Sequence, residues 1–473
     1  MVFSRYQMFT TFHELADCVE DAVWRLKGRT LAVFFNLCLD SIHRVSEDTL
    51  RNLELSSIEN RCGSVDEVVS TAHEVVKRGV VESLTDITYC LLYSIVLGRS
   101  FEVILPDPTM SKMLSEKVSN YTLSLGGVCG LASLTLPRLG CRVILPVTTP
   151  NPTVVNYLKH SSLVEVLYYE DILHTVASEV APYFLHWVFE IETGLKVRFK
   201  SSIIVSRECC RFIASCDYMT LNFPLNVVSK FVNYLFERRG LDATVVSGFQ
   251  VLNRALDPEV MSKLRTLLKL ITDFSHSSRS HIHIELAYCS DFEVLKYVVK
   301  ALPDIVCGIG FNEEELSEVA KCIGLNYGQD FTTMLIDVAS SFLEGNVLYV
   351  TVHSPHFVIS VSRSKELAKY LTTAAAVGNF GVALLNKPGN PSEVLTYCYN
   401  KGSYYIEKLR SVVEGLRRLG FSHIGSGIWV KGDTYVSTYL CMNVPLGRSV
   451  GRGDTFAVFE AIALSELLHG SRR

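Results

Sequence analysis

The sequence predicts an α/β protein with a large domain, whose mostly parallel, doubly wound sheet is flanked by helices, and a smaller α/β lid. Three observations support this. The chain has 473 residues, and a prior of roughly 150 residues per domain gives two or three units. From about residue 242, short apolar runs alternate with amphipathic ones, as in parallel sheets. Two stretches, at about 50–120 and 148–203, interrupt this alternation, so we expect the lid to be built from discontinuous segments.

The expected boundaries follow the interruptions. The large domain takes residues 30–50, 120–147 and 204–473, and the lid takes residues 1–29, 51–119 and 148–203.

The first elements of the large domain surround two polar turns. Residues 30–36 are an apolar run that ends in a polar turn, as a buried parallel strand does, and Asp40 follows closely. Further along, a glycine pair at 126–127 opens an apolar helix that ends near Gly140, and residues 141–147 form the next strand.

The later elements alternate regularly. The predicted strands are 243–247, 280–286, 304–309, 347–353 and 434–441, and the predicted helices are 258–274, 292–302, 313–323 and 455–469. Ligands of such sheets bind at the carboxyl ends of the strands.

Composition excludes several classes of protein. The chain is 48% hydrophobic and 20% charged, which is typical of a globular protein. A net charge of −4 gives no field that would attract nucleic acid or an anionic membrane. The most apolar windows, 87–97 and 348–361, are shorter than the roughly 18–20 residues of a membrane-spanning helix. We therefore expect neither nucleic acid nor membrane as a partner.

The N-terminal residues and the cysteines indicate the compartment. Acidic residues follow the start of the chain closely and no signal-peptide pattern is present, so we expect a cytoplasmic protein. The 14 cysteines are scattered without a C-x-x-C pair, which favours free, mostly buried thiols.

The strongest chemical signal is the sequence Val450-Gly451-Arg452-Gly453-Asp454, directly before an apolar helix. Glycines let the backbone approach a phosphate, and the first N–H groups of a helix stabilise anionic charge. Asp454 can then take a proton from an attacking hydroxyl. The alternative is that Asp454 only caps the helix. The Arg-Gly-Asp tripeptide would suit adhesion only outside the cell.

Two acidic motifs are candidates for a metal site. Glu285 ends the strand with His283, and Glu315 lies three residues after Asn312 at a helix start. Mg²⁺ binds through one or two carboxylates and waters while it bridges phosphates. Each glutamate alone has a structural explanation, since Glu315 also offsets a helix dipole. Their separation by one strand favours the metal, with Asp454 as a further ligand.

The motifs H-x-E, N-x-x-E and G-x-G-D, in this order, resemble those of archaeal ADP-dependent glucokinases and phosphofructokinases in the ribokinase superfamily. The resemblance implies a ribokinase-like large domain that binds the nucleotide. It also implies ADP as phosphoryl donor, Mg²⁺ or another divalent cation as cofactor, and Asp454 as catalytic base. The catalytic group is then Gly451, Arg452, Gly453 and Asp454. Arg452 departs from the small or apolar residue usual in this motif.

The resemblance also implies the sugar site. Asn36 and Asp40 match an N-x-N-x-D turn, and Gly126 and Gly127 match a G-G-x-A-G turn in which Cys129 replaces alanine. Glu82 lies where glucose-using members carry a sugar-binding glutamate, which favours glucose. Basic residues of the lid suit a sugar phosphate instead, or form a solvated face. They are Lys159, Lys196, Arg198 and Lys200.

Nucleotide contacts are expected from Arg207 or Arg211, within a partial match to P-R-E-N-R-F-I, and from His353 and Val450. A metal site formed by His353 and His356 is the alternative for that histidine.

The leading hypothesis is an ADP-dependent hexose kinase that binds a hexose or hexose phosphate and ADP, and releases AMP. It would be a monomer or small homo-oligomer. Alternatives are a phosphofructokinase or bifunctional enzyme, a nucleoside kinase, and a paralogue that binds ligands without turnover. A dinucleotide-dependent dehydrogenase is disfavoured because no G-x-G-x-x-G follows the first strand.

Overall fold

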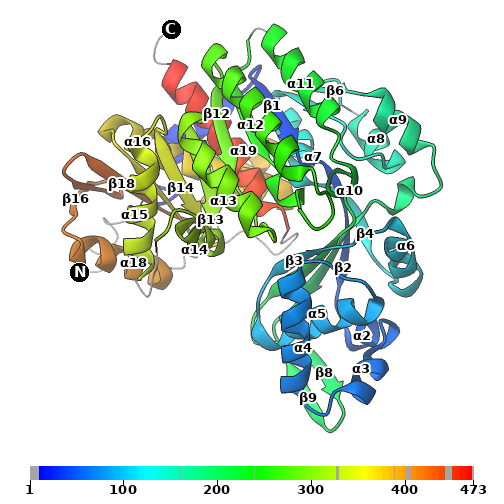
Figure 1. Ribbon diagram of the computed structural model, residues 1–473. Coiled ribbons are helices and arrows are strands. Elements are labelled where there is room, and N and C mark those ends of the chain that lie inside the picture. Colours follow the sequence, from blue (N-terminus) through cyan, green and yellow to red (C-terminus); the bar gives the residue numbers. More distant parts are fainter. Residues whose placement is uncertain are drawn as a thin grey trace.

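The computed structural model describes residues 10–159, 161–238, 240–325, 330–387, 389–400, 406–442 and 450–470, and it shows two lobes (Figure 1). Within these residues the large lobe contains an 11-stranded sheet, and the small lobe contains a five-stranded sheet and a two-stranded hairpin.

The large sheet is parallel over most of its width, which confirms the predicted fold class. Strands run parallel in the order β6-β5-β1-β11-β12-β13-β14 and antiparallel in the continuation β15-β18-β17-β16. The chain builds outward from β1 in both directions, so the carboxyl end of β1 is where such folds bind ligands. The parallel strands are β1 (Thr30–Phe35), β5 (Arg142–Pro146), β6 (Val164–Leu167), β11 (Ala243–Ser247), β12 (His281–Glu285), β13 (Gly308–Asn312) and β14 (Tyr349–His353). The others are β15 (Phe357–Ser362), β16 (Ser422–Gly425), β17 (Ile428–Lys431) and β18 (Thr434–Leu440).

Helices cover both faces of this sheet (Figure 1). One layer contains mutually packed helices: α1 (Ala16–Arg25), α7 (Gly127–Thr135), α16 (Lys365–Asn386) and α19 (Arg452–Gly470). The other is a row in which each helix contacts the next: α11 (Leu225–Glu237), α12 (Val260–Ser277), α13 (Phe292–Ala301), α14 (Glu313–Cys322), α15 (Phe331–Leu343) and α18 (Ile406–Arg418). A short helix, α17 (Pro391–Asn400), follows and packs on α16.

Two buried glycines let α16 and α19 approach closely. A side chain at Gly378 would overlap the ring of Phe456, and one at Gly381 would overlap that of Phe459. This contact holds the start of α19 at the strand ends.

The small lobe has its own sheet, in the order β3 (Phe101–Ile104), β10 (Cys210–Ser215), β7 (His186–Ile191), β2 (Cys38–Arg44) and β4 (Thr122–Gly126). Its helices are α2 (Glu47–Asn52), α3 (Leu55–Arg61), α4 (Val65–Arg78), α5 (Leu84–Leu97) and α6 (Pro108–Lys117). The hairpin of β8 (Lys196–Phe199) and β9 (Ser202–Val205) lies at the end of this lobe away from the large one (Figure 1). Helices α8 (Pro152–Leu158) and α9 (Glu170–Val176) lie beside β6 at the edge of the large lobe, and α10 (Tyr218–Asn222) follows β10 (Figure 1).

Sheet membership differs from the expected boundaries at several points. Strands β2, β4 and β10 lie in the small sheet, although their residues were expected in the large domain. Strand β6 lies in the large sheet and α1 packs on α16 and α19, although both were expected in the lid. Membership depends on pairing between segments far apart in the sequence, which no local pattern encodes.

Among the described strands, the chain passes between the two sheets four times, and two of these crossings are adjacent. Only Asn36 and Leu37 separate β1 of the large sheet from β2 of the small one, and α7 begins directly after β4. The Cys129 backbone N–H donates to the Asn36 carbonyl oxygen at 3.0 Å and ties these two crossings together.

The cysteines agree with the expectation of free, mostly buried thiols. The 14 cysteines are free, and most are buried, with Cys18 and Cys209 exposed. Among the described residues, no helix is long and apolar enough to cross a bilayer.

Candidate active site

Asp454 lies in the first turn of α19, because the helix begins at Arg452. The Thr455 backbone N–H donates to the Gly451 carbonyl oxygen at 3.0 Å, which is the first helical hydrogen bond. Gly451 has a φ of 78° and faces Leu131 of α7, where a side chain would overlap. Asp454 is therefore not the residue that precedes the helix; that position belongs to Gly451.

The two turns expected to bind sugar, one at Asn36 before Asp40 and one at Gly126–Gly127, lie against each other. Asp40 is buried on β2, and the Cys38 thiol donates to its Oδ1 at 3.4 Å. On the neighbouring β4, a side chain at Gly126 would overlap the Asp40 carboxylate. Gly127, with φ 66°, faces Asn36 just as closely. Glycine is thus required at both positions by the close approach of these polar groups.

Asn36 shows that this turn suits a polar ligand. Its side chain is 6% exposed, and its Oδ1 has no hydrogen-bond partner among the described residues. A buried acceptor without a partner costs about 1–3 kcal/mol. A ligand hydroxyl that donates to this oxygen would remove that cost.

Asp454 lies within electrostatic range of this turn. Burial is the main cause that raises the pKa of the Cys38 thiol well above its usual value, and the charges of Asp40, Asp217 and Asp454 add to it. Burial likewise raises the pKa of Cys129, which follows Gly127 in α7, with a further contribution from Asp454. The start of α19 therefore lies near enough to the Asp40 region for its charge to act there.

The acidic motifs meet at the ends of β12, β13 and β14. Glu285 is buried and accepts hydrogen bonds from Nε2 of His353 at 2.6 Å and Nε2 of His283 at 3.4 Å. Burial would raise the pKa of Glu285, but the charge of His353 and the hydrogen bonds of both histidines outweigh it, and the pKa is lowered. Glu285 is therefore ionised.

Glu315 is held by the start of α14. Its Oε2 accepts from the Asn312 backbone N–H at 2.8 Å, and the Asn312 side chain accepts from the Glu314 and Glu315 N–H groups. This reciprocal capping box fixes the carboxyl at the strand end. Burial raises the pKa of Glu315 to about 8, and the charges of Glu285 and Asp454 add to this effect.

These carboxyl groups fit a divalent cation. Burial is the main cause of the raised pKa of Glu315 and the charges of Glu285 and Asp454 add to it, so a cation beside these groups would favour the ionised carboxylates. Carboxylate oxygens are the donors that Mg²⁺ prefers, and Mg²⁺ keeps several waters, so its protein ligands need not all touch.

His353 connects this acidic group to the start of α19. Besides its bond to Glu285, its ring packs on Phe456 with centroids 5.3 Å apart, and a Cβ at Gly453 would lie 2.9 Å from its Cε1. Burial alone would lower the pKa of His353, but the charge and hydrogen bond of Glu285 raise it to about 9. The imidazole that was expected beside adenine thus bonds to a carboxylate through its Nε2.

Several other predicted residues lie on the small lobe or beside Gly451. The Glu82 side chain is 68% exposed and pairs with Arg78 at 3.4 Å. Arg207 is exposed between β9 and β10, and Arg211 lies on β10, both in the small lobe. Val450 and Arg452 flank Gly451 and are partly buried.

Sequence reasoning missed the groups opposite Asp40. His186 on β7 is its partner in the parallel pairing with β2, and His186 Nε2 lies 3.0 Å from Asp217 Oδ2. Burial would lower the pKa of His186, but the hydrogen bond and charge of Asp217 and the charges of Glu102 and Asp40 raise it to about 9. No local signal could have found this histidine, because only strand pairing brings it to the site.

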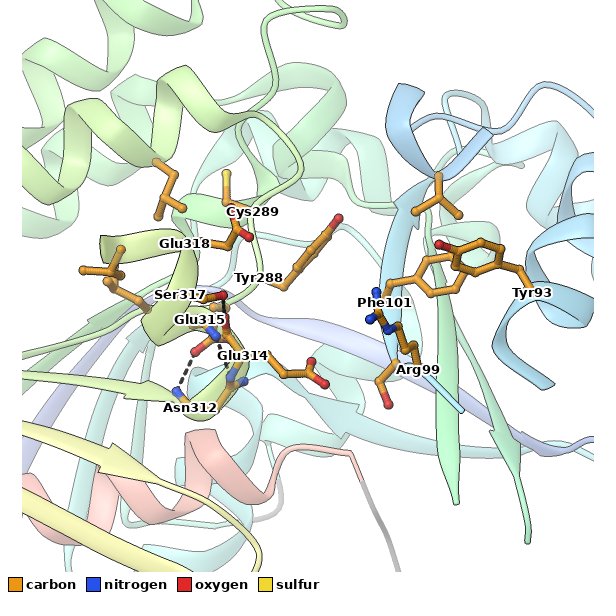
Figure 2. A pocket seen from close by; sticks show the side chains of 16 residues that line it. Tyr93, Arg99, Phe101, Tyr288, Cys289, Asn312, Glu314, Glu315, Ser317 and Glu318 are labelled. Atoms are coloured by element: carbon orange, nitrogen blue, oxygen red, sulfur yellow. Dashed lines mark hydrogen bonds between the residues drawn. The ribbon is translucent and has the colours of Figure 1, made fainter. Parts of the chain in front are cut away.

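A pocket of about 400 Å³ lies between the lobes. Figure 2 shows Tyr288 and Glu314 of the large lobe pointing toward Phe101 and Arg99 of the small lobe. Glu315 also lines it, so the acidic motif borders open space between the lobes.

Comparison with known proteins assigns this chain to a family. The family model described as "ADP-specific Phosphofructokinase/Glucokinase conserved region" matches residues 29–381. The chain belongs to this family. The match confirms the resemblance seen in the sequence motifs, and it makes the protein an ADP-dependent sugar kinase with ADP as phosphoryl donor.

Relatives of this ADP-dependent sugar kinase match it over almost their whole length. The ADP-specific phosphofructokinase of Pyrococcus horikoshii is 22% identical and matches over 92% of this chain and 97% of its own. That of Pyrococcus furiosus is 21% identical, over 89% and 99%. The solved "ADP-dependent kinase complex with fructose-6-phosphate and ADPbetaS" has a TM-score of 0.73 at 16% identity, over 95% and 97% of the two chains. The kinase thus shares their fold.

Proposed function

We propose that this kinase transfers the β-phosphoryl group of ADP to a sugar hydroxyl, giving a sugar phosphate and AMP, with Asp454 as the base. The observation that carries the proposal is the place of Asp454. It lies in the first turn of α19, and its charge acts both on Cys38 beside Asp40 and on Glu315 of the acidic motif. A carboxylate within electrostatic range of both groups supports the assignment of Asp454 as the base.

The proposed chemistry uses each part of this arrangement. Asn36 and Asp40 accept hydrogen bonds from sugar hydroxyls and orient the one that reacts. Asp454 takes its proton as the oxygen attacks phosphorus. The N–H groups at the start of α19 stabilise the negative charge that develops on the transferred group. A divalent cation, held through Glu285 and Glu315, would neutralise phosphate charge.

Fructose 6-phosphate is the acceptor that the relatives favour, since they are named phosphofructokinases and a similar structure was solved with this sugar. The basic residues of the β8–β9 hairpin do not explain how its phosphate would bind, because that hairpin lies at the far end of the small lobe (Figure 1).

Glucose is the second candidate, as the sequence suggested through Glu82. Glu82 is mostly exposed, but Gly79, three residues earlier, packs on Ser290 of the large lobe. The segment that carries Glu82 thus lies against the large lobe, and closure of the lobes would bring Glu82 toward the sugar.

The base assignment is tested by Asp454→Asn. We expect kcat to fall by several orders of magnitude while ADP and sugar still bind, because only proton transfer is removed. Asp66→Asn, an exposed first-turn aspartate of α4, is the matched control and should change kcat less than twofold. Equal losses of binding and turnover would instead make Asp454 a structural residue.

The donor and acceptor are tested by measuring AMP formation from ADP with fructose 6-phosphate, glucose, a nucleoside or no acceptor, and by repeating the assay with ATP. Acceptor-dependent AMP supports a kinase, and the faster sugar identifies the substrate. Saturable binding without AMP would identify a paralogue that lacks turnover.

A further inference from the structure

We propose that Cys38, Asp40 and His186 form a binding site for a thiophilic divalent cation such as Zn²⁺, in addition to the acidic motifs considered for Mg²⁺. In the described part of the chain, these three buried residues form the group whose ligand atoms all lie within 4.8 Å of one another. Thiolate, imidazole and carboxylate together suit Zn²⁺, whereas Mg²⁺ prefers oxygen donors alone.

The spacing of the donors is close to that of a tetrahedral zinc site. Bonds of about 2.3 Å to sulfur and about 2.0–2.2 Å to nitrogen or oxygen put neighbouring ligand atoms roughly 3.3–3.8 Å apart. Cys38 Sγ and Asp40 Oδ1 are 3.4 Å apart. His186 faces Asp40 across the parallel pairing of β2 and β7, so a small side-chain movement completes three ligands.

Asp217 holds the ring of His186 as a carboxylate commonly holds a metal-binding histidine, through the ring nitrogen that does not bind the metal. Asp217 Oδ2 lies 3.0 Å from His186 Nε2, and the other ring nitrogen, Nδ1, is assigned to the cation. The other oxygen of Asp217 accepts from the Met219 backbone N–H at 2.7 Å at the start of α10, so the carboxylate is itself fixed. This carboxylate–histidine pair is an observation independent of the spacing of the three donors.

The surroundings favour a cation. Besides Asp40, the charges of Asp217 and Asp454 act on Cys38, and those of Asp217 and Glu102 act on His186. Binding releases one proton from the Cys38 thiol and one from the His186 imidazolium, and both leave to solvent.

Occupation of this site would compete with the sugar, because Asp40 cannot bind both at once. This consequence, unlike the metal site itself, rests on the function proposed above. Zn²⁺ would then inhibit the kinase competitively with sugar and not with ADP.

Cobalt is the probe, because Co²⁺ replaces Zn²⁺ and its absorption spectrum reports thiolate ligation and tetrahedral geometry. We expect the metal-free full chain to bind one Co²⁺ with a thiolate charge-transfer band. Cys38→Ser should abolish this band and weaken Co²⁺ binding at least tenfold. Cys216→Ser, a buried thiol beside Asp217 but outside the group, should keep both. Thermal unfolding confirms that each variant is folded.

The proposal is overturned if the wild-type chain shows no thiolate band, or if Cys38→Ser retains it. His186→Asn, which should also weaken Co²⁺ binding, gives a second test that leaves the thiol in place. Fructose 6-phosphate and glucose are then added to the cobalt protein. Displacement of Co²⁺ supports the shared site. If Co²⁺ stays bound while sugar is bound, the metal site stands and the assignment of Asp40 to sugar is wrong.

Discussion

Two buried histidines of the candidate site are each paired with a carboxylate. His353 is paired with Glu285, and His186 with Asp217, and in each pair the carboxylate raises the pKa of an imidazole that burial would lower. Both imidazoles are therefore protonated at neutral pH. A buried charge is tolerated because its partner is held in place, so removal of one partner leaves the other uncompensated.

Asp217→Asn tests the second pair. Because the pKa of His186 is raised from 6.5 to about 9 in the folded protein, the pair stabilises fully below pH 6.5, and this stabilisation is lost as pH rises through 9. We expect the variant to lose roughly 3–5 kcal/mol of unfolding free energy at pH 6, with a smaller loss at pH 10. Urea unfolding at both pH values measures this.

The control for this pH dependence is Asp433→Asn, which removes the exposed partner of Arg363. It should cost less than about 1 kcal/mol at either pH. A loss for Asp217→Asn that does not change with pH would contradict the charged pairing.

At the scale of elements, strands bounded by clear turns were predictable from the sequence. The strand at 243–247 is β11, and the helix predicted at 313–323 is α14. The strand predicted at 304–309 begins and ends too early. Residues 302–304 form a 3₁₀ turn containing Pro303, and β13 begins only at Gly308. Ile305 and Val306 are buried without being in a strand, and burial alone produced the misleading apolar pattern.

The candidate site was predictable only where a local motif marks it. The turn before Asp40 joins two strands, and the glycines at 126–127 and 451 each precede a helix; these local patterns are visible in the sequence. The pairing of β2 with β7 joins distant segments and leaves no local pattern, so His186 could not be found. The extent of the small sheet was missed for the same reason.

Asn312→Ala tests whether the α14 cap serves the site as well as the helix. We expect a loss of about 1 kcal/mol of stability and at least a tenfold rise in KM for ADP with its divalent cation, since Glu315 would lose its fixed position. Steady-state kinetics and urea unfolding measure the two effects.

Asp330→Ala is the matched variant, because Asp330 caps α15 by accepting from two N–H groups in the same way. It should lose similar stability and keep its KM. Equal kinetic changes in both variants would show that only helix stability matters.

At the scale of the whole molecule, the two lobes face each other across an open pocket. Its lining comes from both sides, with Arg99 and Phe101 on the small lobe and Tyr288 and Glu314 on the large lobe (Figure 2). Facing polar and aromatic groups suit a surface that closes over bound ligands and excludes water.

Small-angle X-ray scattering tests this closure. We expect the radius of gyration to fall when ADP and sugar are present together, because the small lobe would move toward the large one. Asp40→Ala should weaken the response to sugar. An unchanged radius in the saturated wild-type protein would show that the lobes keep the arrangement of Figure 1.

Two of the four crossings between the described strands of the two sheets, at Asn36–Leu37 and Gly126–Gly127, coincide with the turns proposed to bind sugar. A rotation of one sheet against the other would therefore act on the backbone that presents Asn36 and Asp40, as well as on the connections from β6 to β7 and from β10 to β11. Redesign of this enzyme for another acceptor would therefore alter its stiffness along with its selectivity. Residues farther along the small sheet offer a safer place for such engineering.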